Sequence, residues 1–390
     1  MKILHLVYEC LPGAYRGGVQ KMVAELALAQ GCRGDEVEIW AIGDGPVTQL
    51  GPRTLLRYFP GRIRWGSSAL RQALLAGHAR FDLIHSHNTF LPLNVAAAQA
   101  ARRGAAVYYH AHGALDPQLL RGWGPKEVKK RLYVSGMERR NYDVAQGIFG
   151  LTEAECAQLQ LVGAKAPIFE VGNGIVLQPP AESLAVANFR LVHRVPYGGQ
   201  VILFIGRITH KKGLHHLIDA LPRIRERFPE ALFVIGGDRE QDVEYVRALD
   251  QQISALGLID AIRWVGFLDE VGKRAAFASC RLFAHPSYSE GMALAILEAM
   301  AAGLPTVVTP GCYMSAAVRA GVLTESAQDA GRLAEAITAL FANQEAAARL
   351  GAAGREYVQK YHTWDAVAGR LDRIYRKEPE VAPFIATPVS

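Results

Sequence analysis

Residues 201–213 decide the fold class of this chain, and they read Val201-Ile202-Leu203-Phe204-Ile205-Gly206-Arg207-Ile208-Thr209-His210-Lys211-Lys212-Gly213. The first five residues are continuously apolar, as is typical of a strand buried on both faces of a parallel sheet. Gly206 and Gly213 permit a tight turn, and an apolar helical pattern follows over residues 214–228. The stretch therefore predicts one strand–loop–helix unit of an α/β domain.

The same unit repeats along the 390 residues. Short apolar runs alternate with helical patterns throughout, which predicts doubly wound α/β architecture. We expect ligands to bind at the carboxyl ends of the strands, in a cleft between two similar domains. The runs lie near residues 3–8, 37–42, 82–85, 105–110 and 147–150, and then near 201–205, 231–235, 262–265, 281–284 and 306–308.

Domain boundaries follow from breaks in this pattern. We expect an N-terminal Rossmann-like domain over residues 1–180 and a C-terminal one over 200–363. Between them, residues 181–199 are expected to form a linker, because prolines and a Gly-Gly pair interrupt the alternation there. Residues 364–390 are expected to form a C-terminal helix and tail that cross back to the N-terminal domain.

Composition narrows the class of protein. The five cysteines are scattered and never spaced as C-x-x-C, which argues against a disulfide framework or a zinc ribbon and fits a reducing cytosol. No apolar run reaches the roughly 18 residues of a membrane-spanning helix, and the N-terminus lacks the layout of a signal peptide. We therefore expect a soluble cytoplasmic protein.

The net charge of +6 is unevenly distributed. Residues 1–194 contain 22 Lys and Arg against 15 Asp and Glu, whereas residues 195–390 contain 21 against 22. No acidic residue occurs between Gly45 and Phe81, and a second basic block covers residues 121–140. This asymmetry indicates an anionic partner for the first half, namely a membrane surface, a nucleic acid or a phosphorylated substrate.

Aromatic and aliphatic residues interleave with the arginines of the first basic block. Tyr58, Phe59, Ile63 and Trp65 form the apolar part of this pattern, which predicts a segment resting on anionic lipid headgroups. The alternative is an ordinary basic surface. No known RNA- or DNA-binding motif accompanies the block, so we expect no nucleic-acid partner.

Two cations follow the strand of residues 201–205. Arg207 and Lys212 are expected to project from the turn toward the cleft, where a pair of fixed cations suits a diphosphate. The alternative is a solvated, charged loop. The spacing is not that of a P-loop, because no G-x-x-x-x-G-K-[ST] pattern is present.

Two carboxylates follow the strand of residues 281–284. Glu290 is expected in a loop, and Glu298 about two turns into a helix that begins near Met292. Free N–H groups at that helix start can bind an anion or sugar hydroxyls, and neighbouring carboxylates accept hydrogen bonds from vicinal diols. The alternative for Glu298 is a surface acid, although its neighbours are too apolar for an ordinary exposed helix face.

Glycines and histidines mark the strand ends of the first half. Gly17 and Gly18 lie in a loop that leads from the first strand into a helix, without the fingerprint of dinucleotide binding. Two H-x-H pairs, His85/His87 and His110/His112, each place both rings on one face of a strand. Such pairs can bind a metal ion, but no nearby Cys or carboxylate completes a ligand set, so we expect hydrogen bonds and no metal site.

The ordered combination of these motifs resembles the retaining glycosyltransferases of the GT-B fold, family four. Gly206-Arg207 and Lys212-Gly213 are followed by Glu290 and Glu298 in an E-x-x-x-x-x-x-x-E pattern. The resemblance spans nearly the whole chain. The stretch from His112 to Pro117, followed by 129–133, is similar to a bacterial branch that builds surface polysaccharides.

The resemblance implies a role for each matching residue. Arg207 and Lys212 would bind the donor diphosphate and stabilise it as it leaves. Glu298 would bind the nucleotide ribose, and Glu290 the donor sugar. The remaining implied contacts are His112 with the sugar, Gly17, Gly18 and Gly206 near the phosphates or acceptor, the backbone of Gly291, Met292, Ala293 and Leu294 with the sugar, and residues 265–268 with the base.

The implied reaction transfers a sugar, with retention, from a UDP- or GDP-sugar to a polyprenyl-linked or saccharide acceptor in cell-surface polysaccharide or lipopolysaccharide biosynthesis. No cofactor and no metal ion are expected, because two cationic side chains neutralise the leaving group. The enzyme would be cytoplasmic, with peripheral contact to the inner face of the cytoplasmic membrane. Met292-Ala293 replaces a common Phe-Gly, so the sugar is not predicted. The alternatives are a glycosyltransferase for a soluble small acceptor, and a non-catalytic protein that binds a nucleotide sugar or nucleic acid.

Overall fold

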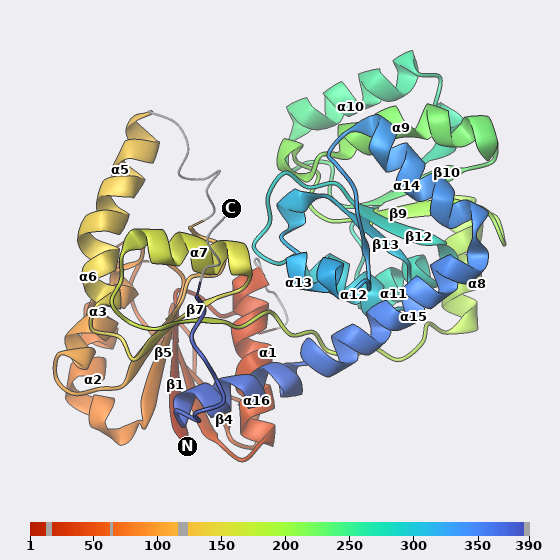
Figure 1. The fold of residues 1–390 in the computed structure, drawn as a ribbon. Coiled ribbons are helices and arrows are strands. Elements are labelled where there is room, and N and C mark those ends of the chain that lie inside the picture. The colour runs from red at the N-terminus through yellow and green to blue at the C-terminus, as the bar shows by residue number, and fades with distance from the viewer. Residues whose placement is uncertain (13–17, 63–64, 116–123, 386–390) are drawn as a thin grey trace. The chain divides into compact units, whose positions relative to one another are not determined.

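A computed structural model describes residues 1–12, 18–62, 65–115 and 124–385 of the chain (Figure 1). The chain divides into two compact units. Unit 1 comprises Met1–Val176 and His362–Ser390, and unit 2 comprises Leu177–Tyr361. Each unit is a Rossmann-like α/β domain built on one sheet, as the alternation of apolar runs and helical patterns predicted.

The sheet of unit 1 has eight strands in the order β3-β4-β2-β1-β5-β6-β7-β8. Neighbouring strands are parallel except β3 and β4, which form an antiparallel edge. The strands are β1 (Lys2–Val7), β2 (Glu36–Ile42), β3 (Thr48–Gly51), β4 (Thr54–Phe59), β5 (Leu83–His87), β6 (Val107–His110), β7 (Gly147–Gly150) and β8 (Ile168–Glu170).

Helices cover both faces of this sheet, and the side chains of β1 alternate between the two cores that result. Ile3 and Val7 pack with α1 (Gly18–Cys32) and α16 (Trp364–Tyr375), while Leu4 and Leu6 pack on the opposite core. That second core includes residues of α2 (Ser68–Gly77), α3 (Pro92–Ala101) and α7 (Glu153–Val162). The remaining helical segments of unit 1 are η1 (His78–Arg80), α5 (Pro125–Tyr133), η2 (Val134–Glu138) and α6 (Arg139–Tyr142).

The sheet of unit 2 has six parallel strands in the order β11-β10-β9-β12-β13-β14. They are β9 (Val201–Ile205), β10 (Leu232–Gly236), β11 (Ile262–Gly266), β12 (Leu282–His285), β13 (Thr306–Val308) and β14 (Thr324–Glu325). The helical segments are α8 (Ser183–His193), η3 (His210–Lys212), α9 (Leu214–Arg227), α10 (Val243–Ala255), η4 (Ile259–Ala261), α11 (Glu270–Ser279), α12 (Leu294–Ala301), η5 (Pro310–Cys312), α13 (Ser315–Arg319), α14 (Ala330–Ala342) and α15 (Gln344–Tyr361).

Residue periodicity explains how α9 covers this sheet. Leu214, Leu217, Ile218, Leu221 and Ile224 are buried at helical spacing, on the face that meets the strands. Charged residues occupy the other face of the helix. The strand–loop–helix unit predicted from residues 201–228 is therefore confirmed, and it places the loop between β9 and α9 at the carboxyl end of the sheet.

The expected linker is wrong as a description of residues 181–199. Residues 183–193 form α8, which packs against α11 within unit 2 and buries Phe189. The prolines that suggested a linker flank this helix rather than interrupt it, since proline is tolerated outside helix interiors. The unit boundary instead falls between Val176 and Leu177.

The chain passes from unit 2 to unit 1 between α15 and α16. Thr363 pairs with Ile175 through an isolated bridge, and its hydroxyl caps α16 by accepting a hydrogen bond from the Ala366 N–H. The Trp364 indole then donates to Glu25 on α1 at 2.6 Å. Residues 364–375 thus belong to the core of unit 1.

Candidate functional site

The turn after β9 buries a lysine at the carboxyl end of the unit 2 sheet. Lys212 ends the short helix η3 and is 8% exposed, although lysine is normally a surface residue. Gly213 follows it with φ +67°, and a Cβ at this position would collide with the Pro286 carbonyl oxygen. The turn therefore requires glycine at 213 and brings Lys212 against the loop after β12.

That loop is held to the η3 turn by hydrogen bonds. The Tyr288 N–H donates to the Lys211 carbonyl at 2.9 Å, and the Ser287 hydroxyl donates to the same oxygen at 3.0 Å. The Thr309 hydroxyl donates to the Ser287 carbonyl at 2.7 Å. Two loops that are about 75 residues apart in sequence consequently form one rigid rim, with Lys212 and Glu290 on it.

Glu290 forms a buried cluster with Lys212 and His285. Its Oε1 atom lies 2.5 Å from Lys212 Nζ and 3.0 Å from His285 Nε2. Burial opposes ionisation of Glu290, but the hydrogen bond from His285 and the Lys212 ammonium outweigh it, so the pKa of Glu290 lies well below its usual range. Burial lowers the pKa of His285. The cluster thus offers a carboxylate, a neutral imidazole and an ammonium group.

Arg207 differs from Lys212 in being uncommitted. It is exposed, and its side chain makes no hydrogen bond or ion pair with any residue that the structure describes, whereas Lys212 is paired with Glu290. Gly206, which precedes it, is half-buried, and a Cβ there would press on the Phe204 ring. The predicted pair of cations is therefore present at one loop, with one buried and one free to bind an anion.

Helix α12 begins at Leu294, two residues later than the position near Met292 that we expected. Ala293 is its N-cap and supplies no side-chain hydrogen bond, so the first turn leaves N–H groups for other acceptors. Gly291, Met292 and Ala293 are half-buried in the approach to the helix. This start of a helix beside an ionised carboxylate can bind polyhydroxylated or anionic groups.

Glu298 lies one turn further along α12 and is not a solvated surface acid. Its side chain is 20% exposed, and Lys273 of α11 donates to its Oε1 atom at 2.8 Å. Lys273 also lies 3.0 Å from Glu270. The carboxylate is held in place while one side remains accessible. Residues 265–268, at and just beyond the end of β11, include the exposed ring of Phe267.

Five histidines gather at the carboxyl end of the unit 1 sheet. His5 of β1, His85 and His87 of β5, and His110 of β6 are 3% exposed or less. His112 follows β6 with a positive φ of 57°. His5 is the member that sequence reasoning missed; it pairs in register with His85 across β1 and β5, which becomes visible only when the strands are placed side by side.

These imidazoles make hydrogen bonds mainly with one another. Both ring nitrogens of His87 form hydrogen bonds: Nε2 lies 2.8 Å from His5 Nδ1, and Nδ1 lies 2.9 Å from His112 Nε2. His85 Nδ1 lies 2.8 Å from the Tyr375 hydroxyl. Burial lowers the pKa of His5 to about 4 and that of His110 to about 3, so the rings are neutral at pH 7. Of the H-x-H residues, His85, His87 and His112 make ring hydrogen bonds, whereas neither ring nitrogen of His110 has a partner among the described residues.

The geometry of these rings also meets one condition for binding a metal ion. His5, His85 and His87 form one group of ring nitrogens within 4.8 Å of one another, and His87, His110 and His112 form a second. Neutral imidazoles are ligands of zinc and copper. Neither group includes a carboxylate or a thiolate.

Several predicted residues lie elsewhere. Gly17 and the Asp116-Pro117 pair lie outside the described residues. Gly18 begins α1 and is exposed, and a Cβ added there would meet no atom within 4 Å. Unit 1 and unit 2 therefore each present one group of candidate residues at the carboxyl end of their own sheet.

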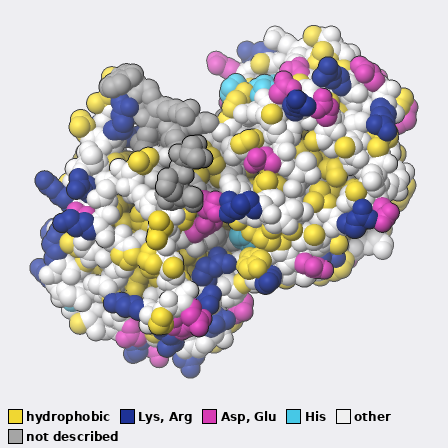
Figure 2. All heavy atoms as spheres, in the orientation of Figure 1, with side chains coloured by type: hydrophobic (Ala, Val, Ile, Leu, Met, Phe, Trp, Pro, Cys, Tyr) yellow, Lys and Arg dark blue, Asp and Glu magenta, His cyan; other side chains and the backbone are white. Residues whose placement is uncertain are grey.

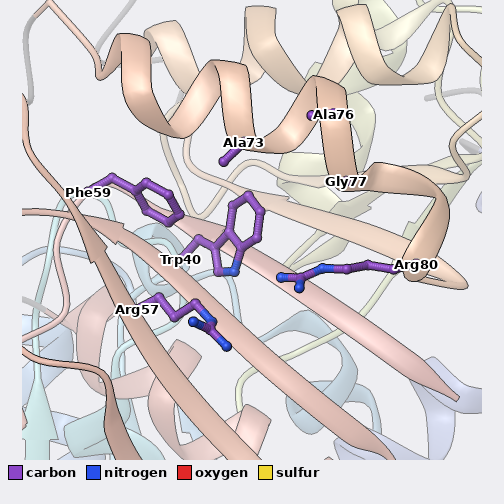
Figure 3. Close-up of a pocket in the computed structure, with 7 residues that line it drawn as sticks. All are labelled: Trp40, Arg57, Phe59, Ala73, Ala76, Gly77 and Arg80. Carbon is purple, nitrogen blue, oxygen red and sulfur yellow. The ribbon is translucent and has the colours of Figure 1, made fainter.

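A separate hollow of about 330 Å³ lies between α2 and the strands β2 and β4 (Figure 3). Trp40 stands at its centre with Phe59 on one side and Arg80 on the other. Arg57 and Arg80 both lie 3.0 Å from Glu38, which neutralises part of their charge. None of the predicted site residues lines this hollow.

The surface of unit 1 is rich in Lys and Arg, as dark-blue side chains on the left body of Figure 2 show. The predicted apolar residues among the arginines are only partly exposed. Trp65 is 76% exposed. Tyr58 and Phe59 face opposite sides of β4, because side chains alternate along a strand. The Tyr58 hydroxyl donates to the Cys10 carbonyl at 2.6 Å, and Phe59 lines the hollow. Ile63 lies outside the described residues.

Comparison with known proteins identifies the family. Residues 16–178 match the family described as "Glycosyltransferase Family 4", and residues 187–357 match "Glycosyl transferases group 1". The chain belongs to the family-four glycosyltransferases. Phosphatidyl-myo-inositol mannosyltransferase of Mycobacterium leprae is 29% identical over 92% of both chains. D-inositol 3-phosphate glycosyltransferase of Corynebacterium urealyticum is 27% identical over 62% of this chain and 59% of its own.

Solved structures with the GT-B fold resemble this glycosyltransferase over nearly its whole length. HepE of Anabaena, in complex with UDP and glucose, has a TM-score of 0.75 at 20% identity and covers 97% of this chain and 100% of its own. Sucrose-phosphate synthase of Thermosynechococcus elongatus has the same TM-score at 20% identity, covering 96% and 98%. The predicted GT-B fold of two doubly wound domains is confirmed.

No helix in the described ranges of this glycosyltransferase combines the length and apolarity that a membrane span requires.

Proposed function

We propose that this glycosyltransferase moves a sugar, with retention and without a metal ion, from a nucleotide-diphosphate sugar to a lipid-linked acceptor in cell-surface polysaccharide biosynthesis. The observation that carries the proposal is the rim of unit 2. There the Lys212–Glu290–His285 cluster and the Lys273-held Glu298 flank the start of α12, and the exposed Arg207 lies in the same loop as Lys212.

The donor would be bound by charge and hydrogen bonding along this rim. Arg207 and Lys212 neutralise the diphosphate, and the backbone N–H groups from Gly291 to Leu294 bind the sugar together with Glu290. Glu298 accepts hydrogen bonds from the two ribose hydroxyls. Each assignment matches the chemistry of the group, since carboxylates accept from diols and cations pair with phosphates.

The cations act mainly in the transition state. As the bond from the anomeric carbon to the diphosphate breaks, negative charge grows on the leaving oxygen, and fixed cations stabilise this state more than the bound donor. The acceptor oxygen bonds to the anomeric carbon on the face that the diphosphate leaves, and the departing phosphate takes the acceptor proton. Glu290 is engaged by Lys212 and His285, which supports a mechanism without a carboxylate nucleophile.

A lipid-linked acceptor is supported by the surface of unit 1 and by the relatives. Helix α5 is basic in its last turn, and Leu132 next to that turn is 68% exposed, as is typical of segments that rest on anionic lipid. The mycobacterial relative is named for transfer to phosphatidylinositol. The protein would then work at the inner face of the cytoplasmic membrane.

A soluble acceptor is the second candidate. The corynebacterial relative is named for transfer to inositol 3-phosphate, and the same basic surface would suit a phosphorylated small molecule.

Two assays separate these candidates. A thermal-shift screen of UDP-, GDP- and ADP-sugars identifies the donor, because a ligand stabilises the folded state by RT ln(1 + [L]/Kd). Transfer from the radiolabelled donor is then measured to a lipid extract and to soluble inositol phosphates. Stabilisation by no sugar nucleotide, or hydrolysis without transfer to either acceptor, contradicts the proposed function.

Membrane contact has its own test. Flotation with vesicles of anionic and neutral phospholipid is expected to recover the protein only with the anionic vesicles, and less at high salt. Leu132→Ser should weaken this binding, and Leu184→Ser, which changes an exposed leucine of unit 2, should not. Equal recovery with neutral vesicles would exclude the anionic-surface part of the proposal.

A further inference from the structure

A continuous chain of hydrogen bonds runs through the histidines of unit 1, from Gln30 to His112. Gln30 Oε1 lies 2.7 Å from His5 Nε2, and His5 Nδ1 lies 2.8 Å from His87 Nε2. His87 Nδ1 lies 2.9 Å from His112 Nε2. At the far end, His112 Nδ1 is covered from water and has no partner among the described residues.

We propose that Gln30 sets the tautomer of His112 through this chain. The Gln30 amide oxygen can only accept, so His5 carries its proton on Nε2. A neutral imidazole has one N–H, so the bare Nδ1 of His5 accepts from His87 Nε2. By the same step the bare Nδ1 of His87 accepts from His112 Nε2, which leaves His112 Nδ1 as a pure acceptor.

The proposed proton positions require that the imidazole rings of His5, His87 and His112 are neutral. Burial is the largest cause that lowers the pKa of His5, His87 and His112, and no carboxylate is in hydrogen-bond contact with any of the three rings among the described residues. His112 also stacks on His110, with ring centroids 3.9 Å apart, so its orientation is fixed together with its proton.

The consequence concerns substrate choice, and it rests on the proposed function. If His112 meets the donor sugar, its bare Nδ1 accepts a hydrogen bond from a sugar hydroxyl and cannot donate to one. Gln30, His5 and His87 then act as positioning residues for His112. A donor analogue with fluorine in place of that hydroxyl would leave the nitrogen unpaired, which a buried polar site disfavours.

Nitrogen NMR of the full chain, labelled with ¹⁵N-histidine, tests the tautomer without any substrate. Protonated and bare imidazole nitrogens have clearly different ¹⁵N shifts, and single histidine replacements assign them. We expect His5, His87 and His112 each to carry the proton on Nε2 at pH 7.5. Gln30→Met should mix both tautomers at all three rings, because the methionine side chain offers His5 Nε2 no oxygen acceptor.

Tyr375→Phe is the matched control. It removes the hydroxyl that contacts His85 and the Gln30 side chain, but every hydrogen bond of the chain itself, from the Gln30 amide oxygen to His112, stays in place, so the tautomer of His112 should not change. Nδ1-protonated His112 in the wild type, or no change in Gln30→Met, overturns the proposal. A shift of His87, His110 and His112 together on adding Zn²⁺ at stoichiometric amounts also overturns it, because the cluster would then be a metal site.

Kinetics provide the second readout. With UDP-glucose and GDP-mannose as donors, Gln30→Met should lower kcat/KM about tenfold, the equivalent of one hydrogen bond. If neither donor is used by the wild type, the proposed function fails while the NMR result still decides the tautomer. An unchanged kcat/KM in Gln30→Met with mixed tautomers excludes the role of the chain in substrate choice.

Discussion

The two units carry opposite chemistry at the same place in the same architecture. At the carboxyl end of its sheet, unit 1 places five imidazoles that burial keeps neutral. At the carboxyl end of its own sheet, unit 2 places the ion pair of Lys212 with Glu290 and the free cation of Arg207. The net charges of the two halves show the opposite distribution: the first half of the sequence is the basic one, yet its candidate site is neutral.

The two units therefore differ in where their charged groups lie: on the surface in unit 1, and in the candidate site in unit 2. The positive charge of unit 1 lies on exposed side chains of helices and loops, where it acts on distant anions and is screened by salt. The charges of unit 2 are few but fixed by buried hydrogen bonds, so they act on one bound group at short range. A protein that transfers a group from a charged donor needs the second kind at the donor.

Acidification should have the largest effect, because it charges more buried histidines in unit 1 than in unit 2, where His285 is the one buried histidine among the described residues. A histidine with a lowered pKa in the folded state contributes stability that is complete above pH 6.5 and is lost as the pH falls toward the folded value. For His5, with a pKa of about 4, this loss is roughly 3 kcal/mol, and four more buried histidines add to it. Unit 1 should therefore open between pH 6.5 and 4.

Hydrogen-exchange mass spectrometry after a pH jump reads the two units separately. Peptides of β1, β5 and β6 are expected to lose protection before those of β9 and β12. Earlier opening of the unit 2 strands, or simultaneous opening of both units, would contradict this order. Unit 2 is less sensitive because fewer of its histidines are buried: His285 is buried, and His215, with a pKa of about 4, is half-buried. The depressed pKa of Glu290 preserves its contribution until the pH falls through the usual range of a carboxyl group.

Removal of Lys212 should affect both the stability and the activity of unit 2. Lys212→Met leaves Glu290 buried and ionised without its ammonium partner, which costs about 3–5 kcal/mol. Urea denaturation measures this loss. The double variant Lys212→Met/Glu290→Gln should recover most of the stability and none of the activity. A single variant as stable as the wild type would show that the pair is not desolvated.

Removal of Arg207 should affect activity alone. Arg207→Ala is expected to lower kcat about 100-fold, or about 3 kcal/mol, because the lost contact acts on the leaving group. The melting temperature should stay unchanged, since Arg207 is exposed and has no partner in the described structure. Arg247→Ala, in the exposed face of α10, is the control and should leave both quantities unchanged. Near-wild-type turnover of Arg207→Ala would remove the argument for a charged donor site.

The backbone of the Lys212 turn gives the smallest of these effects. Gly257→Ala places a side chain at φ +66° in open space, so it measures the conformational cost alone, about 1 kcal/mol. Gly213→Ala has nearly the same φ but also collides with Pro286, so it should cost about 2 kcal/mol more. Thermal unfolding compares the two variants. Equal losses would mean that the loop after β12 does not fix the turn.

The sequence predicted most of what local pattern controls. Apolar runs identified both central sheets, and the loops after β9 and β12 were placed correctly because strand, glycine and helix follow one another in the chain. The pattern missed β4, since Thr54–Phe59 mixes arginine and polar residues beside the edge strand β3. It also took 181–199 for a linker, because flanking prolines mark the ends of a helix as well as the absence of one.

The sites were harder to predict because their contacts cross the sheet. His285 precedes Glu290 by five residues, and its role was visible only once β12 ended beside the η3 turn. Gln30 lies on a buried face of α1, where helical spacing predicts core rather than a partner for His5. Lys273 meets Glu298 from a neighbouring helix. Such pairings depend on strand order, which residue spacing does not encode.

The return of the chain to unit 1 has a consequence for its synthesis. Trp364, Val367, Leu371 and Ile374 of α16 are part of the core that α1 and β1 share. A ribosome makes these residues only after all of unit 2 has been synthesised, so unit 2 leaves the exit tunnel before them, and domains generally fold as units in the order in which they are made. Unit 2 can therefore finish first, while unit 1, although begun earlier, waits with an open core for its last helix.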